Sequence, residues 1–236
     1  MPDHFDHQFA PVPGLQAILS ATTTLRACAL VFDNDYKHPL VLAKELATMD
    51  VLSGGRVEVG LGAGWMIADY EQAGMTYDRP GVRIDRFVEG LAVIKGVMGA
   101  EPFSFEGEHY TINEHNGFPK PIQGPHPPVI IGGGGKRVLG IAAREADIVG
   151  VNGTLHAGVI GPDAIATMTR DAVVDKVAIV ADAAQAAGRL DAIEMNVRTF
   201  FVSVTDDRDG QIAAMAGLIG VDERMIRESP FALIGS

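Results

Sequence analysis

The sequence contains a single cysteine, Cys28, and no apolar run that approaches the length of a membrane span. One cysteine cannot form an intrachain disulfide, and a lone thiol is typical of a reducing compartment, so a cytoplasmic protein is expected. A membrane helix needs about 18 consecutive apolar residues. The first basic residue is Arg26, so no signal peptide is predicted. Secreted and membrane proteins are therefore not expected.

Basic residues are also scarce. Nineteen Lys and Arg face 30 Asp and Glu, which gives a net charge of −11 and a pI near 5.0. The phosphates of a nucleic acid would be repelled at long range, and no basic stripe offsets this repulsion. Nucleic acid is therefore excluded as a predicted partner.

The chain has 236 residues, of which 47% are hydrophobic, enough for a core without disulfides or metals. Short apolar runs alternate with helical periodicity and no repeat interrupts them, so a single α/β domain is predicted over residues 1–236, with a parallel sheet covered by helices. Strands are predicted at 25–32, 56–61, 129–131, 148–151 and 195–204. Helices are predicted at 39–52, 65–72, 82–98, 136–146, 162–187 and 209–219. A period of two at residues 101–113 predicts an inserted hairpin.

Two glycine clusters each follow a predicted strand and precede a predicted helix, where main-chain amides can approach an anion. The first, at residues 60–65, has the spacing GxGxG rather than the dinucleotide fingerprint GxGxxG. The second, at residues 132–135, is followed by Lys136 and Arg137 and indicates a phosphate site. The alternative for the second cluster is a flexible turn with two solvated basic residues.

Histidine and tryptophan supply the remaining candidates. His4 and His7 lie in the N-terminal segment with two aspartates, but no cysteine or distant histidine completes a ligand set, so no metal site is predicted. Trp65, the only tryptophan, follows a strand end and either packs in the core or lines a pocket. Sequence signatures of hydrolases and kinases are absent.

An ordered set of motifs is more specific than any of these features alone. They are Asp3-His4-Phe5, Thr24-Leu25-Arg26, Lys37-His38-Pro39, Leu42-Ala43-Lys44-Glu45, residues 49–56, the cluster at 60–65 and the run at 132–135. The set resembles the bacterial luciferase-like monooxygenase family, in particular its branch that uses the deazaflavin coenzyme F420. The resemblance implies a (β/α)₈ TIM barrel with the coenzyme at the carboxyl ends of the strands. Only five strands are predicted, so we expect an incomplete barrel that lacks the first strand, most of the second and the last.

The resemblance also implies roles for individual residues. His4 matches a histidine near the reactive face of the coenzyme ring and is the predicted catalytic residue. The predicted coenzyme contacts are Ala29 and Leu30, where the family has a non-prolyl cis peptide, Gly133, Gly134 and Gly135 around the phosphate, and Val151 and Asn152 beside them. Trp65 is predicted to line the substrate pocket at a place where some relatives carry an acidic proton donor.

These matches predict hydride transfer between F420 and a small organic substrate of unknown identity. Two alternatives remain: an FMN-dependent luciferase-like monooxygenase, and a non-catalytic or vestigial barrel fragment that binds a cofactor. Dimers are common among relatives, which leaves a homodimer open.

Overall fold

The structure is a computed structural model that describes residues 1–155 and 158–236. The chain forms two compact units, residues 1–132 with 145–148, and residues 133–144 with 149–236. A single barrel domain over the whole chain stays a prediction.

A parallel sheet forms the core of the first unit. β3 (Val57–Gly62) lies between β1 (Ala27–Cys28) and β6 (Val129–Gly133), and β2 (Phe32–Asp33) also pairs with β3. The apolar side chains of β3 are almost fully buried, as expected for a sheet covered on both faces.

The continuous strand predicted at 25–32 is wrong. Two short strands, β1 and β2, pair with opposite ends of β3. Between them the chain approaches β3 so closely that a Cβ on Gly60 would lie 1.9 Å from the carbonyl oxygen of Ala29. The apolar run at 25–32 correctly indicated buried side chains. A buried segment need not form the hydrogen bonds that pair a strand with its neighbour.

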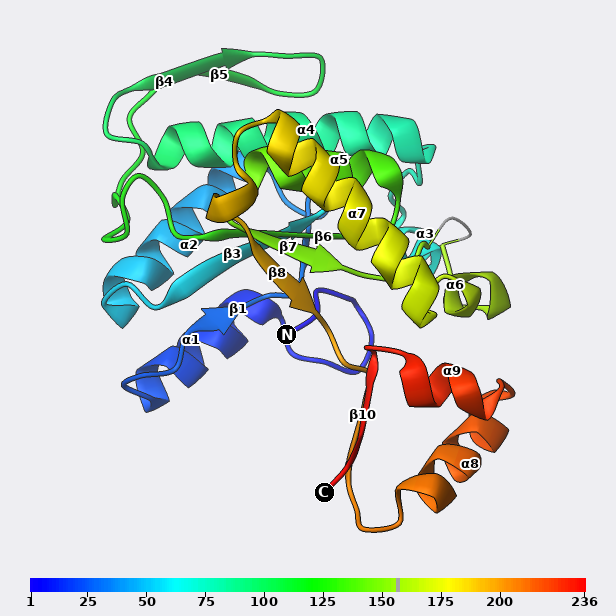
Figure 1. The fold of residues 1–236 in the computed structure, drawn as a ribbon. Helices are drawn as coiled ribbons and strands as arrows, with labels where there is room; N and C mark the ends of the chain where they lie inside the picture. Colours follow the sequence, from blue (N-terminus) through cyan, green and yellow to red (C-terminus); the bar gives the residue numbers. More distant parts are fainter. Residues whose placement is uncertain (156–157) are drawn as a thin grey trace. The chain divides into compact units, whose positions relative to one another are not determined.

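Four helices belong to the first unit: α1 (Pro11–Ala21), α2 (Pro39–Ser53), α3 (Ile67–Ala73) and α4 (Pro80–Met98). At the start of α2, Nδ1 of His38 accepts a hydrogen bond from the Leu40 amide, and the helix ends at Gly54 with φ 70°. The proline start and glycine end follow the usual asymmetry of helices. α2 and α4 pack against each other (Figure 1). The predicted apolar stripe of α4 is buried, namely Phe87, Leu91, Ile94 and Met98.

An antiparallel hairpin, β4 (Phe103–Glu106) and β5 (Thr111–His115), occupies the segment where a hairpin was predicted. The carboxylate of Glu89 on α4 accepts hydrogen bonds from three consecutive main-chain amides at the turn, those of residues 108, 109 and 110, at 2.8, 2.8 and 3.1 Å. A Cβ on Gly107 would lie 2.3 Å from Oε2 of Glu89. One side chain thus attaches the turn to α4.

The second unit contains helices α5 to α9 and strands β7 to β10. Their bounds are α5 (Lys136–Glu145), β7 (Ile148–Val151), α6 (Pro162–Ala166), α7 (Arg170–Ala186), η1 (Leu190–Ala192), β8 (Glu194–Val197), β9 (Phe201–Val204), α8 (Arg208–Ile219), α9 (Glu223–Glu228) and β10 (Ala232–Gly235). β9 and β10 are parallel, and α8 and α9 pack beside β10 around Ile212, Ala216 and Ile226 (Figure 1).

Two predicted elements of this unit are divided in the structure. The helix predicted at 162–187 is interrupted where Thr169 caps α7 by accepting a hydrogen bond from the Ala172 amide. Serine and threonine favour such caps over helix interiors. The strand predicted at 195–204 consists of β8 and β9.

Candidate functional site

His4, the predicted catalytic residue, is held by a buried carboxylate. Its Nδ1 lies 2.6 Å from Oδ2 of Asp69 on α3, and the exposed fractions of the two side chains are 17% and 2%. The other carboxylate oxygen of Asp69 accepts the Phe5 amide at 3.3 Å. The segment around His4 is therefore fixed to α3 by both main chain and side chain.

Two aromatic residues complete the surroundings of this pair. The rings of His4 and Trp65 meet edge to face, with centroids 5.5 Å apart. The hydroxyl of Tyr36 donates to Oδ2 of Asp69 at 2.8 Å. Burial, followed by the nearby carboxylates and this hydrogen bond, raises the pKa of Tyr36. The structure thus brings the predicted catalytic residue and the predicted pocket residue into contact.

The predicted coenzyme contacts Ala29 and Leu30 lie between β1 and β2. Ala29 is fully buried, and the non-prolyl cis peptide joins Leu30 to Val31, one residue beyond the predicted pair. A Cβ on Gly62 would lie 2.6 Å from a methyl carbon of Val31. The glycine in β3 is required because Val31 occupies that space.

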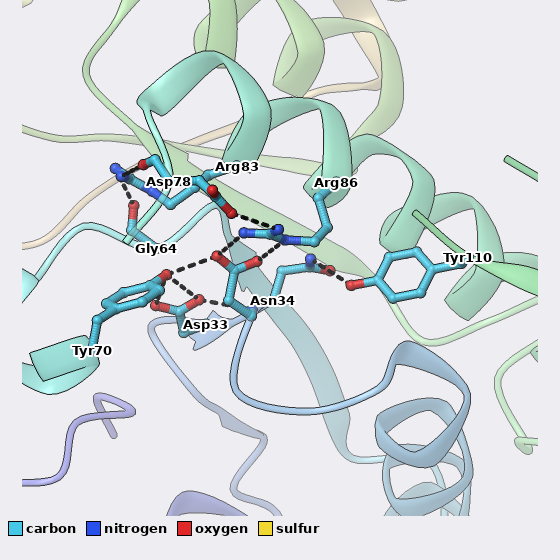
Figure 2. Close-up of polar contacts among 9 residues, drawn as sticks. Asp33, Asn34, Gly64, Tyr70, Asp78, Arg83, Arg86 and Tyr110 are labelled. Carbon is cyan, nitrogen blue, oxygen red and sulfur yellow. Dashed lines mark hydrogen bonds and ion pairs between the residues drawn. The ribbon is translucent and has the colours of Figure 1, made fainter. Parts of the chain in front are cut away.

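A cluster of charged and polar side chains surrounds Gly64 of the first glycine cluster (Figure 2). Arg86 on α4 binds both carboxylate oxygens of Asp35, at 2.7 and 2.8 Å, and also Asp78 at 2.9 Å. The Tyr70 hydroxyl contacts Asp35 and the neighbouring Asp33. Burial is the largest cause that raises the pKa of Asp33 to about 7.

This cluster shapes the loop that carries Trp65. Gly64 has φ 73°, and a Cβ there would lie 2.0 Å from the Tyr70 hydroxyl. Arg83 donates to the Gly64 carbonyl at 3.4 Å (Figure 2). The Tyr77 hydroxyl donates to the Trp65 carbonyl at 2.8 Å. The first cluster is therefore packed against protein groups on this side, and its glycines are explained by close contacts.

In the second glycine cluster, residues 133–135 belong to the second unit, and not all of them are explained by close contacts. A Cβ on Gly134 would lie 2.3 Å from the Gly153 carbonyl oxygen, and one on Gly133 would lie 2.5 Å from Val138. A Cβ on Gly135 would meet nothing within 4 Å, and its φ is not positive. Neither packing nor backbone conformation requires glycine at position 135.

Gly135 precedes α5, whose first-turn amides have no carbonyl one turn earlier and carry the positive end of the helix dipole. Lys136 and Arg137 are exposed, and the first turn of α5 contains no Asp or Glu. Basic side chains are electrostatically unfavourable at a helix N-terminus. The two basic side chains at this helix end would be more favourable with a bound anion than in the helix alone.

Val151 is the last residue of β7, and Asn152 follows it directly. Val151 is buried, and the Asn152 amide donates to the Gly133 carbonyl at 2.9 Å. Lys176 is 6% exposed, and its ammonium group donates to the Asn152 carbonyl at 2.7 Å and to the Thr167 carbonyl at 2.8 Å. The structure thus brings the predicted residues 133, 134 and 152 together, and a buried lysine binds the carbonyl of the last of them.

Sequence reasoning missed Asp69, Asp33, Asp35, Arg86 and Lys176. Asp33 and Asp35 did carry a signal, because two carboxylates flanking one residue directly after an apolar run are typical of a strand end that faces a site. Asp69 and Lys176 lie inside helical periodicity, and nothing in the pattern distinguishes them from surface charges.

Membrane and metal features can be assessed for residues 1–155 and 158–236. Within those ranges no helix combines the length and apolar character needed to cross a membrane. In the same part of the chain, His, Cys, Asp and Glu side chains form no group of three that could hold a metal ion.

The sequence comparisons identify one protein family. The luciferase-like monooxygenase family matches residues 1–219. The FMNH(2)-dependent dimethylsulfone monooxygenase of Pseudomonas putida is 32% identical over 154 residues, which are 65% of this chain and 42% of that protein. The chain therefore belongs to the luciferase-like monooxygenase family, and it spans less than half the length of this relative.

Solved structures give the same fold. The coenzyme F420-dependent tetrahydromethanopterin reductase from Methanopyrus kandleri matches with a TM-score of 0.74 and 24% identity, over 92% of this chain and 61% of that chain. An F420-dependent secondary alcohol dehydrogenase, solved with an F420-acetone adduct, matches with a TM-score of 0.75 and 20% identity, over 100% of this chain and 76% of that chain. At these identities the likeness shows the fold alone, which is the α/β fold of the luciferase-like TIM barrels.

Proposed function

We propose that the protein is an oxidoreductase that transfers a hydride between coenzyme F420 and a small organic substrate. The observation that supports this most is the placement of His4, bound through Nδ1 to a buried carboxylate and packed against Trp65. F420 would supply the carbon centre that accepts or releases the hydride. A cytoplasmic location and a homodimer belong to the same proposal.

The residues present suit such a coenzyme. Gly135 leaves open space directly before the first-turn amides of α5, with Lys136 and Arg137 beside it. A phosphate group would be bound by those amides and would offset the two basic side chains. In the first unit, Ala29 and Leu30 precede the cis peptide and are the proposed contacts of the ring.

His4 would accept or donate the proton that is transferred together with the hydride. Histidine can hold or release a proton near neutral pH. During oxidation of an alcohol, its Nε2 would take the hydroxyl proton, and in the reverse direction it would return that proton to the carbonyl oxygen. The ring of Trp65 would limit the access of water to His4.

Coenzyme choice is tested by fluorescence titration of the protein with F420 and, separately, with FMN at equal salt concentration. Saturable binding with preference for F420 is expected. Turnover is then measured with reduced F420 and menadione as an artificial hydride acceptor. His4→Ala should lower kcat by about 10²-fold, within the range of general acid–base contributions, and leave the Kd for F420 unchanged. Equal losses of kcat and affinity, or unchanged turnover, would contradict the role of His4.

The second candidate is an FMN-dependent monooxygenase, which is favoured by the similarity to the dimethylsulfone monooxygenase of Pseudomonas putida. Deazaflavins react poorly with oxygen. Oxygen uptake by the protein in the presence of reduced FMN and dimethylsulfone, together with tighter binding of FMN, would therefore favour this candidate. Binding of F420 and FMN alike without any turnover would instead favour a non-catalytic protein.

A further inference from the structure

Asp69 differs from an ordinary surface carboxylate in its burial and in its number of donors. It is 2% exposed and lies on α3, which is 65 residues away from His4 in the sequence. Its two oxygens accept from the Phe5 amide, from the Tyr36 hydroxyl and from the ring of His4. No lysine or arginine is among these partners, so a main-chain amide, a phenol and an imidazole fix the geometry of the carboxylate.

The contact with Asp69 also determines which ring nitrogen of His4 remains available. A carboxylate is an acceptor only, so Nδ1 must carry a proton at 2.6 Å from Oδ2. In the neutral ring Nε2 then has a free lone pair. Among the described residues Nε2 has no hydrogen-bond partner, whereas Nδ1 is fully occupied.

We infer that Asp69 is a positioning residue that holds His4 in the Nδ1–H tautomer and thereby presents Nε2 to the substrate. This inference rests on the proposed function for its chemical consequence, since Nε2 is the atom proposed to exchange the substrate proton. Its structural part, the tautomer, is independent of any substrate. Tyr36 supports the role because its hydroxyl donates to the same oxygen and restricts the rotation of the carboxylate.

The variant Asp69→Asn tests this arrangement with the least change in volume. The Phe5 amide is a donor and requires the carbonyl oxygen of the new amide at the Oδ1 position. The NH₂ group is then placed against Nδ1 of His4, where it can only donate. The ring must move its proton to Nε2, which is the wrong tautomer for accepting a substrate proton, as in serine proteases whose triad aspartate is replaced by asparagine.

The first measurement is the ¹⁵N chemical shift of both ring nitrogens of His4 at a pH where the ring is neutral, with the signal assigned by loss in His4→Gln. We expect a proton on Nδ1 in the parent protein and on Nε2 in Asp69→Asn. Glu71→Gln, which removes an exposed negative charge from the same helix, should keep the parent tautomer. A proton on Nε2 in the parent protein would overturn the inference, even without a folded variant.

The second measurement separates kcat from affinity, with reduced F420 and menadione. Asp69→Asn should lower kcat by about 10²-fold with an unchanged Kd for F420, whereas Glu71→Gln should change neither. If His4→Ala abolishes turnover but Asp69→Asn does not, the inference fails and the proposed function stands. If F420 does not bind, or if His4→Ala turns over normally, the proposed function fails, while the tautomer measurement still decides what Asp69 does to His4.

Discussion

The hydroxyl oxygen of Tyr70 lies 2.9 Å from Oδ2 of Asp35 and within 3.3 Å of both carboxylate oxygens of Asp33 (Figure 2). The single hydroxyl proton of Tyr70 cannot be donated to all of these carboxylate oxygens at once. Asp35 is already neutralised by Arg86, so the arrangement is satisfied when Asp33 carries a proton and donates it to Tyr70, which then donates to Asp35.

Asp33 should therefore make stability depend on pH. Its pKa rises from an ordinary 3.8 to about 7 on folding, chiefly because of burial. The folded state binds more protons than the unfolded state between these values, so the free energy of unfolding falls as pH increases from about 4 to about 7. At about 1.4 kcal/mol per pH unit, this change in pKa corresponds to a total loss on the order of 4 kcal/mol.

Asp33→Asn should remove this dependence. We expect the variant to be more stable than the parent protein at pH 8 and nearly equal to it at pH 4, by urea unfolding at both pH values. Asp182→Asn, at an exposed site on α7, should show no such pH-dependent difference. A constant difference between Asp33→Asn and the parent at both pH values would show that the pKa of Asp33 does not change on folding.

Glycines 134 and 135 should respond oppositely to the same substitution. Gly134→Ser places a Cβ 2.3 Å from the Gly153 carbonyl oxygen, so the main chain must shift, and a loss of about 2 kcal/mol in stability is expected. Gly135→Ser meets open space and keeps a good N-cap for α5. It should leave the melting temperature unchanged and weaken F420 binding about tenfold. Unchanged affinity in Gly135→Ser would argue against a phosphate at this position.

Lys176→Met should destabilise the protein at the end of β7. The substitution keeps the length of the side chain but leaves the carbonyls of Asn152 and Thr167 without their buried donor. We expect a loss of about 2–3 kcal/mol in the free energy of unfolding, measured in urea. Arg170→Met, which removes an exposed positive charge from the N-terminus of α7, should be neutral or slightly stabilising.

Asp50→Ala should destabilise the first unit. This fully buried carboxylate on α2 accepts the amides of Ile122 and Gln123 at 2.8 and 3.0 Å and the side-chain amide of Gln123 at 2.7 Å. Removing it leaves three donors unpaired, and we expect a loss of about 3 kcal/mol. Glu101→Ala, at an exposed site, is the control. A loss below about 1 kcal/mol, as for ordinary surface substitutions, would mean that water replaces the carboxylate.

Hydrophobic periodicity correctly predicted the helix and the strand that bury a continuous stripe of apolar side chains. The stripe from Phe87 to Met98 and the alternation of β3 are long enough to determine the type of element. The same signal merged β1 with β2 and β8 with β9, because hydropathy reports burial and not hydrogen-bond pairing. It also missed α1, whose segment contains two prolines and a glycine.

Residues of the candidate site that lie in sequence motifs were predicted, and residues whose role depends on tertiary contacts were missed. His4 and Trp65 were found through motifs that resemble a known family. Asp69 could not be found, because its role depends on a contact across 65 residues. Lys176 was missed for the same reason, since a lysine that binds main-chain carbonyls has no partner side chain to indicate it.

The attachment of the β4–β5 hairpin to α4 also affects how this part of the chain tolerates sequence change. Glu89 and Gly107 are the two positions that this attachment requires, because the other groups at the turn contribute main-chain amides that every residue except proline provides. Side chains at 108 and 109 can therefore vary without releasing the turn. A fluorescent label on the side chain at 108 or 109 would therefore leave the main-chain amides free to bind Glu89 and would stay attached to α4.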